Sequence, residues 1–369
     1  MTSRLLAYYL PQYHPIPENN KWWGDGFTEW TNVTKAKPLF RDHYQPRYPA
    51  DLGYYDLRVP EIREQQAAMA KAHGIEGFVY YHYWFGNGKK LLERPFQEVL
   101  QSRKPDFPFC LCWANESWKG VWHGEFTGKT LIEQTYPGRK DFEAHFYHLL
   151  PAFADERYIK VDGKPVFNVY LPLKLPDLKM FVDVFNNLAI KEGFSGMFLI
   201  ASRCPLEWNP LANNFDGVIG SEIMQIRYGK WNKYNKAKYY YIKKRIENIL
   251  FNTFSVKIKK RIKPLILEYK EVINDLITDR DFDFDYYPCV IPNWDNTARV
   301  GKHSIVFHNS TPELFQLHLK AAIKKVQHLK ESQRFIFIKS WNEWAEGNYL
   351  EPDKRFGYGY LEKIKECLC

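Results

Sequence analysis

The sequence predicts an α/β fold, a single (β/α)8 barrel of the TIM type, in which eight parallel strands alternate with helices. Short apolar runs alternate with longer segments of helical periodicity along the 369 residues. Polar and aromatic residues follow nearly every run, and a closed barrel brings the carboxyl ends of all its strands to one face. A doubly wound open sheet is the alternative fold, but it gives no reason for this recurrence.

The strand candidates are short apolar runs of four to eight residues. They are Leu5–Leu10, Gly77–Trp84, Phe109–Trp113, Val166–Tyr170, Met197–Ala201, Gly217–Ser221, Cys289–Pro292 and Phe335–Lys339. Among the helix candidates, Pro60–His73 has the clearest boundaries, with Pro in its first turn and Gly74 after its end. The other helix candidates carry apolar residues at helical spacing, and they are Lys140–Phe153, Leu178–Lys191 and Pro312–Leu329.

Two segments interrupt the barrel pattern. Residues 15–58 form a long first βα loop rich in Trp, Tyr and Pro, and loops of this length are usually functional. Residues 226–285, between the sixth and seventh strands, are predicted to be a basic helical insertion. Within it, residues 227–270 hold fourteen Lys or Arg and two Glu, a balance of +12, so the remainder carries −3 of the total +9. The chain as a whole, 1–369, is expected to be one domain.

The expected compartment is the cytoplasm. The first strand begins near Leu5, which leaves no room for a secretory signal, and no run of 18 apolar residues predicts a membrane-spanning helix. The six cysteines show no zinc-ligand spacing and are interpreted as reduced thiols, mostly in the core. The role of Cys367 and Cys369 stays open.

The most informative motif is Trp341-Asn342-Glu343-Trp344-Ala345-Glu346-Gly347, which follows the last strand. Two carboxylates three residues apart in an aromatic cleft suit the making or breaking of glycosidic bonds, because apolar surroundings keep one of them protonated. Glu343 and Glu346 are therefore the predicted catalytic residues. A solvated loop with two ordinary glutamates is the alternative interpretation.

Six ordered blocks make the sequence resemble a known family. They are Tyr8–His14, Gly26–Trp30, Tyr80–Trp84, Trp113–Trp118, Pro292–Arg299 and Trp341–Glu351. Together they are similar to the WbsX-type family of bacterial polysaccharide-locus proteins, which resembles glycoside hydrolase family 99, a family of endo-acting α-mannosidases and α-mannanases with (β/α)8 barrels. The resemblance covers nearly the whole chain except the basic insertion.

The resemblance implies a retaining reaction without a nucleophile from the protein. Glu343 would remove the proton from the 2-hydroxyl of the sugar, which attacks the anomeric carbon and forms a 1,2-anhydro sugar. Glu346 would protonate the leaving oxygen and later activate the acceptor. The sequence departs from the compared hydrolases at Ala345, where they have His, and this leaves the exact substrate open.

Polar and aromatic residues at the strand ends are the candidates for substrate binding. They are Tyr9, His82, Tyr83, Trp113, Asn115, Glu116, Trp118, Arg203, Glu222, Trp294, Asn296, Trp341, Asn342 and Trp344. Trp faces stack on sugar rings, and Asn both donates and accepts hydrogen bonds. For Glu116 and Glu222, ion pairing with Arg203 or Arg299 is the alternative. For His82, it is a structural hydrogen bond.

Two other function classes remain open. Asp281-Phe282-Asp283-Phe284-Asp285 contains the Asp-x-Asp pattern with which some glycosyltransferases hold a metal and a sugar nucleotide. It lies far from any Gly-rich phosphate loop, so we expect no metal and no cofactor. A carbohydrate-binding protein without catalysis is the third hypothesis, and the paired glutamates argue against it.

The expected partner is an oligo- or polysaccharide from surface-polysaccharide biosynthesis, such as O-antigen or capsule, carried on a lipid. Residues 227–270 mix cationic with Tyr, Phe and Ile side chains, which suits peripheral contact with an anionic inner-membrane surface. Nucleic-acid binding is the rival interpretation of a basic segment, but nothing else in the sequence supports it. A solvated helical hairpin is the third.

Overall fold

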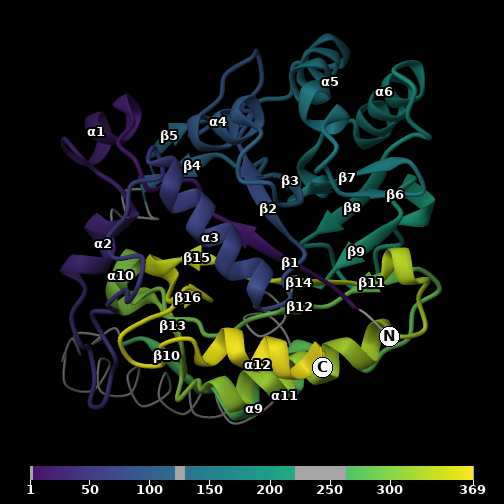
Figure 1. Cartoon of the computed structure of the whole chain (residues 1–369). Coiled ribbons are helices and arrows are strands. Elements are labelled where there is room, and N and C mark those ends of the chain that lie inside the picture. Colours follow the sequence, from purple (N-terminus) through teal and green to yellow (C-terminus); the bar gives the residue numbers. More distant parts are fainter. Residues whose placement is uncertain (1–2, 121–128, 221–262, 369) are drawn as a thin grey trace, which may run out of the picture.

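Residues 3–120, 129–220 and 263–368 are the part of the chain that this computed structural model describes. Parallel strands form a nearly closed barrel with helices around it (Figure 1). In spatial order the barrel strands are β11, β9, β8, β7, β3, β2, β1, β14 and β12. In the same order their bounds are Asp285–Tyr287, Gly217–Ile219, Phe198–Ser202, Lys164–Val169, Phe109–Trp113, Gly77–His82, Arg4–Tyr9, Phe335–Ile338 and Cys289–Val290.

The seventh position in the barrel is one chain segment in two parts. β11 pairs with β9, while β12, just after Pro288, pairs with β14. Proline has no N–H to donate, and the Pro288 carbonyl accepts a hydrogen bond from the Phe337 amide at 3.0 Å. Residues 285–290 therefore link the two edges, which gives the eight positions that the sequence predicts.

Strand register decides which side chains face the barrel interior. Neighbouring residues in register share a face of a sheet, and the face alternates along each strand. Tyr8 is in register with Val79, and Tyr81 is in register with Cys112. The rings of Tyr8 and Tyr81 stack inside the barrel with centroids 5.2 Å apart. The residues beside them in sequence, such as Tyr9, point outward to the helices.

The helices follow ordinary start signals. Pro60 opens α3, the Asp177 carboxylate accepts from the Met180 amide at the start of α6, and the Thr311 hydroxyl does the same for Leu314 at the start of α11. The helices are α1 (Pro17–Trp23), α2 (Glu29–Lys35), α3 (Pro60–Ala72), α4 (Arg94–Ser102), α5 (Arg139–Ala154), α6 (Leu178–Lys191), α9 (Tyr269–Leu276), α10 (Thr297–Val300), α11 (Pro312–Val326) and α12 (Gly359–Leu368).

Short strands outside the barrel build the loops. β6 (Lys160–Val161) forms a hairpin with β7, and β4 (Trp118–Lys119) pairs with β5 (Thr130–Ile132). β10 (Leu265–Glu268) pairs in parallel with β13 (Ile305–His308), and β15 (Asn342–Glu343) pairs with β16 (Asn348–Tyr349). The β10–β13 sheet and α9 enclose a small apolar cluster of their own, which includes Trp294.

The predicted barrel is confirmed, since each of the eight strand candidates overlaps an observed strand and the four helix candidates correspond to α3, α5, α6 and α11. The first βα loop contains α1 and α2. Of the predicted insertion at 226–285, residues 226–262 lie outside the described part of the chain. Its described remainder contains strand β10 and helix α9 as well as the start of the seventh strand. In the described residues, no helix is both long and apolar enough to cross a bilayer.

Candidate active site

A cavity of about 410 Å³ opens at the carboxyl ends of the barrel strands. Its walls come from residues at or after all eight strand positions and from the first βα loop. Glu343 and Glu346 lie on its wall, together with aromatic side chains such as Tyr81 and Trp294. A concave site that combines aromatic surface with a few convergent polar groups suits a small ligand or a sugar.

The loop that carries the two glutamates is held by close backbone contacts. Asn342 binds the Leu10 backbone twice, accepting from its amide at 2.7 Å and donating to its carbonyl at 3.0 Å. Gly347 follows with φ of +54°, and a Cβ there would lie 2.9 Å from the Asp295 carbonyl oxygen. Only glycine fits that position without displacement of the backbone. The loop therefore packs directly against the segment that follows β12.

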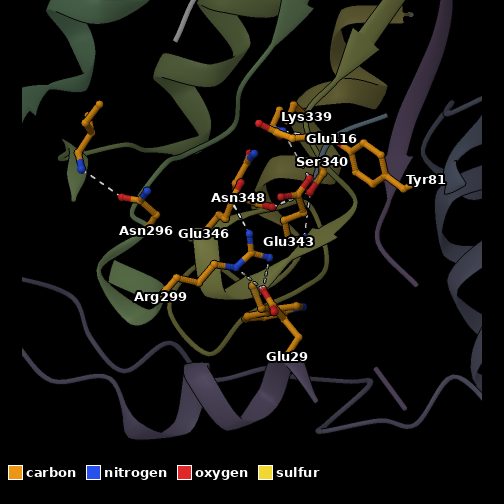
Figure 2. A network of polar contacts seen from close by, with 12 residues as sticks. Glu29, Tyr81, Glu116, Asn296, Arg299, Lys339, Ser340, Glu343, Glu346 and Asn348 are labelled. Atoms are coloured by element: carbon orange, nitrogen blue, oxygen red, sulfur yellow. Dashed lines mark hydrogen bonds and ion pairs between the residues drawn. The ribbon is translucent and has the colours of Figure 1, made fainter. Parts of the chain in front are cut away.

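Glu346 lies in an ion-pair chain with Arg299 and Glu29. An Nη of Arg299 is 2.6 Å from Oε1 of Glu346, and its Nε is 3.0 Å from Oε1 of Glu29 (Figure 2). Burial raises the pKa of Glu346, but the charges of Arg299, Lys339 and Arg203 and the hydrogen bond from Glu343 outweigh burial and lower that pKa below its ordinary value. Glu346 is therefore ionised at neutral pH. Burial raises the pKa of Glu29, which Arg299 opposes.

Glu343 has a weaker cationic neighbour. Lys339 Nζ lies 3.6 Å from its Oε1, and the side chain is almost fully buried. Burial is the main reason that the pKa of Glu343 rises to about 8, with the charge of Glu346 adding to the effect and Lys339 opposing it. Burial also lowers the pKa of Lys339, but Glu343 and other neighbours outweigh this and raise it above its ordinary value. At neutral pH Glu343 holds a proton.

The two carboxyl groups form a coupled pair with one proton between them. Glu343 donates one side-chain hydrogen bond to Glu346, which raises the pKa of Glu343 and lowers that of Glu346. A pair with one acid and one carboxylate has the composition that acid–base catalysis needs. In the unliganded protein the proton lies on Glu343, whereas the resemblance assigned the base role to Glu343 and the acid role to Glu346.

Eight predicted site residues line the cavity. They are Tyr83, Glu116, Trp118, Arg203, Trp294, Asn296, Glu343 and Glu346. Burial raises the pKa of Glu116, while Arg203 opposes this from 4.0 Å. The ion pair between Glu116 and Arg203, which was the alternative for Glu116, is therefore present, but its two atoms are as far apart as an ion pair allows. Arg299 pairs with Glu29 and Glu346 instead.

Four predicted residues point away from the cavity because they occupy outward-facing positions or loops. The Tyr9 hydroxyl donates to Gln66 of α3 at 2.6 Å, and His82 contacts His145 of α5 at 2.9 Å between their Nε2 atoms. The Trp113 indole donates to the Trp84 carbonyl at 3.0 Å. Asn115 exchanges two hydrogen bonds with the Leu171 backbone. The structural hydrogen bond considered for His82 is thus what the structure contains.

The remaining predicted residues belong to the loop that carries Glu343 and Glu346 or lie outside the described chain. Trp341 is fully buried against Phe78, and the side chain of Asn342 is used by the Leu10 backbone. Trp344 donates to Glu351 at 2.6 Å and stacks on Tyr349. These three side chains position the loop and do not line the cavity. Glu222 lies outside the described residues.

Several cavity residues were absent from the predicted set. They are Tyr8, Tyr81, Tyr170, Arg299 and Lys339, and Glu29 lies behind Arg299. Lys339 donates to the Tyr81 hydroxyl at 3.3 Å and lies within cation–π distance of Tyr81, Tyr170 and Trp294. Strand alternation was the signal that could have found Tyr8, Tyr81 and Lys339, as argued below. No sequence signal placed Glu29 beside Arg299.

The Asp281–Asp285 segment lies away from the cavity wall. Asp281 is fully exposed and its closest cation is Lys325 at 3.5 Å, while Asp285 belongs to β11 and accepts from the Tyr287 hydroxyl. Over residues 3–120, 129–220 and 263–368, no group of three or more His, Cys, Asp or Glu is arranged to hold a metal ion. None of the five cysteines in these ranges forms a disulfide.

Comparison with known protein families shows which family the chain belongs to. A family model described as "Glycosyltransferase WbsX" matches residues 5–364. The chain belongs to the WbsX family. The match includes the barrel, both glutamates and the whole cavity wall.

Two curated relatives support this placement. Proteins described as "Uncharacterized protein WxcX", from two strains of Xanthomonas campestris pv. campestris, are 33% and 32% identical to the chain over 369 residues. They align with all of this chain, which spans about half the length of each relative.

Solved structures support the barrel fold. A "Glycoside hydrolase-like protein" matches with a TM-score of 0.57 at 16% identity, covering 99% of this chain and 94% of the other. The GH99 endo-alpha-mannosidase from Bacteroides thetaiotaomicron matches with a TM-score of 0.56 at 14% identity, covering 100% and 97%. Identity this low supports the fold alone. The family is described as glycosyltransferases, and the fold is the one that these solved structures share.

Proposed function

We propose that the protein cleaves or transfers a glycosidic linkage of a bacterial surface polysaccharide with retention at the anomeric carbon, and that an α-mannosidic linkage is the first to test. The coupled pair of Glu343 and Glu346, one protonated and one ionised in an aromatic cavity, is the observation that carries this proposal. Turnover of polysaccharide fragments, with product configuration followed by NMR, tests it. Release of the inverted anomer would contradict it.

In the first step of the proposed reaction, the 2-hydroxyl of the bound sugar gives its proton to Glu343. Its oxygen then bonds to the anomeric carbon as the bond to the leaving oxygen breaks. Glu346 gives its proton to that leaving oxygen. The products are a 1,2-anhydro sugar and a free hydroxyl on the leaving group.

In the second step, water or a sugar hydroxyl attacks the anomeric carbon and opens the anhydro ring. Glu346 takes the proton of the attacking group, and Glu343 returns its proton to the 2-oxygen. Both carboxyl groups recover their starting protonation, so one proton on the pair supports the full cycle. The acceptor alone decides between hydrolysis and transfer.

The proton must move to Glu346 before the first step, because it lies on Glu343 in the unliganded protein. The bound sugar favours this shift, since its 2-hydroxyl donates to Glu343 and its leaving oxygen accepts from Glu346. The hydrogen bond between the two carboxyl groups supplies the route. Glu29 helps by offsetting part of the positive charge of Arg299, which otherwise keeps Glu346 ionised.

The pH dependence of kcat/KM tests the shared proton. The pair loses it as pH rises through the pKa of Glu343 at about 8, so activity should fall above that pH. Lys339 lowers the pKa of Glu343, so Lys339→Met should move the fall in activity to higher pH. Lys191→Met, which alters an exposed lysine on α6, is the control and should leave the profile unchanged. A shift to lower pH in Lys339→Met would contradict the assignment.

We also propose that the basic segment 227–270 binds an anionic membrane surface, which would bring the cavity near a lipid-linked substrate. Its charge of +12 with interleaved aromatic residues supports this. Most of the segment lies outside the described residues. Binding to liposomes should require anionic lipid, weaken with salt, and disappear when residues 230–263 are replaced by a short linker. Equal sedimentation of both proteins would contradict it.

A further inference from the structure

Glu351 is a buried carboxylate to which the proposed reaction assigns no step. It follows β16 in the chain and is 2% exposed. Its Oε2 accepts from the Trp344 indole at 2.6 Å and from the Tyr55 hydroxyl at 2.9 Å, and its Oε1 accepts from the Gln66 amide at 2.6 Å. An ionised carboxylate only accepts hydrogen bonds, so it fits these donors without a proton of its own.

Stability alone does not account for a carboxylate at this position. Burial raises the pKa of Glu351 to about 7, while the hydrogen bonds from Trp344, Gln66 and Tyr55 oppose this. These donors are neutral, so they offer no opposite charge to offset the loss of water around the carboxylate. Well-packed apolar side chains often stabilise a fold more than buried charges do. The contacts of Glu351 therefore point to a role at the site beyond stability.

Two of the donors connect Glu351 to other elements of the barrel. Gln66 of α3 also accepts from the Tyr9 hydroxyl of β1 at 2.6 Å. Tyr55, in the first βα loop, also accepts from the Asn342 side chain at 3.3 Å. The loop that contains Asn342 and carries both glutamates is thereby connected through Glu351 to α3 and β1.

Trp344, the third donor, lies between the two glutamates in the sequence. Its ring stacks on Tyr349 with centroids 3.8 Å apart. Stacking fixes the plane of the ring but lets it slide within that plane, whereas the hydrogen bond from its nitrogen to Glu351 fixes its position there. A short helical turn joins Trp344 to Glu346, and Glu343 directly precedes it. A displacement of the ring therefore moves both carboxyl groups.

We propose that Glu351 is a positioning residue, which holds the Trp344 indole and thereby fixes the separation of the two catalytic carboxyl groups. This inference rests on the proposed function, in which one proton passes between those groups. A hydrogen bond weakens steeply when its length or angle changes, and a misplacement of about 1 Å lowers turnover by up to about a hundredfold. Glu351 is not part of the cavity wall, so substrate binding should change little when it is replaced.

Two substitutions of Glu351 test its role as an acceptor. Glu351→Met has a similar length but offers the Trp344 indole no strong acceptor, so kcat on polysaccharide fragments should fall about ten- to a hundredfold while KM changes less than about twofold. Glu351→Gln keeps a carbonyl oxygen for that indole, and Gln66 can turn its own amide to accept from the new NH2 group, so most of the activity should remain. An unchanged kcat in Glu351→Met, or an equal loss in both variants, would overturn the proposal.

The pH dependence of kcat separates positioning from a general loss of folded protein. Besides burial, the charge of Glu346 and the hydrogen bond to it raise the pKa of Glu343, while Lys339 and Arg299 lower it. When the two carboxyl groups move apart, that pKa should fall, so the activity of Glu351→Met should decline at a lower pH than that of the wild type. Loss of folded protein lowers activity without such a shift, and an unmoved profile would overturn the proposal.

A titration that needs no turnover distinguishes failure of this inference from failure of the proposed function. NMR can follow the Glu343 carboxyl carbon in protein labelled with carboxyl-enriched glutamate, and Glu343→Gln assigns the signal. A lower pKa of Glu343 in Glu351→Met than in the wild type supports the inference even if no glycoside is turned over, in which case the proposed function alone fails. An equal pKa overturns the inference.

Substitution of the donor tests the same hydrogen bond from its other side. Trp344→Phe keeps a ring for stacking on Tyr349 but has no indole nitrogen, so it should reproduce the loss of kcat and the pH shift of Glu351→Met. The double variant should lose no more than either single variant, because both remove the same contact. Additive losses would overturn the proposal. If Glu351→Met does not fold, Trp344→Phe decides alone, and a normal kcat there overturns the proposal.

Asp141→Leu is the matched control. Asp141 of α5 is buried and accepts from the Trp84 indole at 3.1 Å, which is the same kind of contact in another part of the fold. Its removal should lower Tm but leave kcat and the pH profile unchanged. A pH shift in Asp141→Leu as large as that in Glu351→Met would mean that the shift reports general damage, and would overturn the proposal.

Discussion

Glu343→Gln and Glu346→Gln should each lower turnover by at least about a hundredfold, the usual loss when a positioned acid or base is removed. Gln has nearly the shape of Glu but neither accepts nor releases a proton at neutral pH. Steady-state assays on polysaccharide fragments measure the loss. Near-normal activity in either variant would show that the changed residue is not catalytic.

The folded state should change little in these variants. Glu343 is already neutral in the resting protein, so an amide there changes no charge next to Lys339. In Glu346→Gln, Arg299 keeps its ion pair with Glu29. Thermal unfolding and circular dichroism check both variants, and a large fall in Tm would mean that lost activity reflects lost folding.

A substrate that needs no acid separates the two roles. Fluoride leaves a glycosyl fluoride without a proton from the enzyme, whereas removal of the 2-hydroxyl proton is still required. Glu346→Gln should therefore recover much of its activity on the fluoride, and Glu343→Gln should not. The reverse result would mean that the resting protonation, with the proton on Glu343, is also the catalytic one.

Sequence patterns predicted the barrel because all of its strands are short, apolar and buried, and because polar residues follow them. Glu343 and Glu346 were predicted to lie at the cavity because they are three residues apart in sequence and follow the last strand. The Arg299–Glu29 pair was not predicted, since it joins residues 270 positions apart through the packing of α2 against the loop that carries Glu343 and Glu346.

The errors among the strand-end residues follow from strand alternation. Tyr9, His82 and Trp113 were chosen for their chemistry, yet each is one residue away from an inward-facing position. Tyr8 and Tyr81 occupy inward positions on the strands of Tyr9 and His82, and Lys339 occupies an inward position at the end of β14. A register for one pair of strands would have separated the two sets, because the face alternates strictly along a strand. Register itself depends on contacts between distant residues.

The largest effect on stability is expected at Asp295, which follows β12 and is fully buried. Its Oδ2 accepts from His43 and from Gln45, each at 2.8 Å, and its Oδ1 accepts from the Thr297 hydroxyl at 2.6 Å. Arg47 lies 3.6 Å away. This carboxylate therefore connects the first βα loop, through hydrogen bonds, to the segment that carries Trp294, Asn296 and Arg299.

Asp295→Ala should lower the free energy of unfolding by about 3–5 kcal/mol, because it leaves Arg47 and several donors buried without their acceptor. Denaturant unfolding measures this change. Asp183→Ala removes an exposed ion pair with Lys179 on α6 and should cost no more than about 0.5 kcal/mol. Similar losses in both variants would contradict the role given to Asp295.

The pH dependence of stability gives an independent check on Asp295. Burial raises its pKa, but the hydrogen bond from His43, the charges of Arg47 and His43 and the hydrogen bond from Thr297 outweigh burial and lower it from 3.8 to about 2. A lowered pKa contributes stability above the unfolded value, and this contribution is lost as pH falls from about 4 to about 2. The wild type should therefore lose about 2 kcal/mol more than Asp295→Ala over that window. Parallel loss in both proteins would mean that other carboxylates cause the acid unfolding.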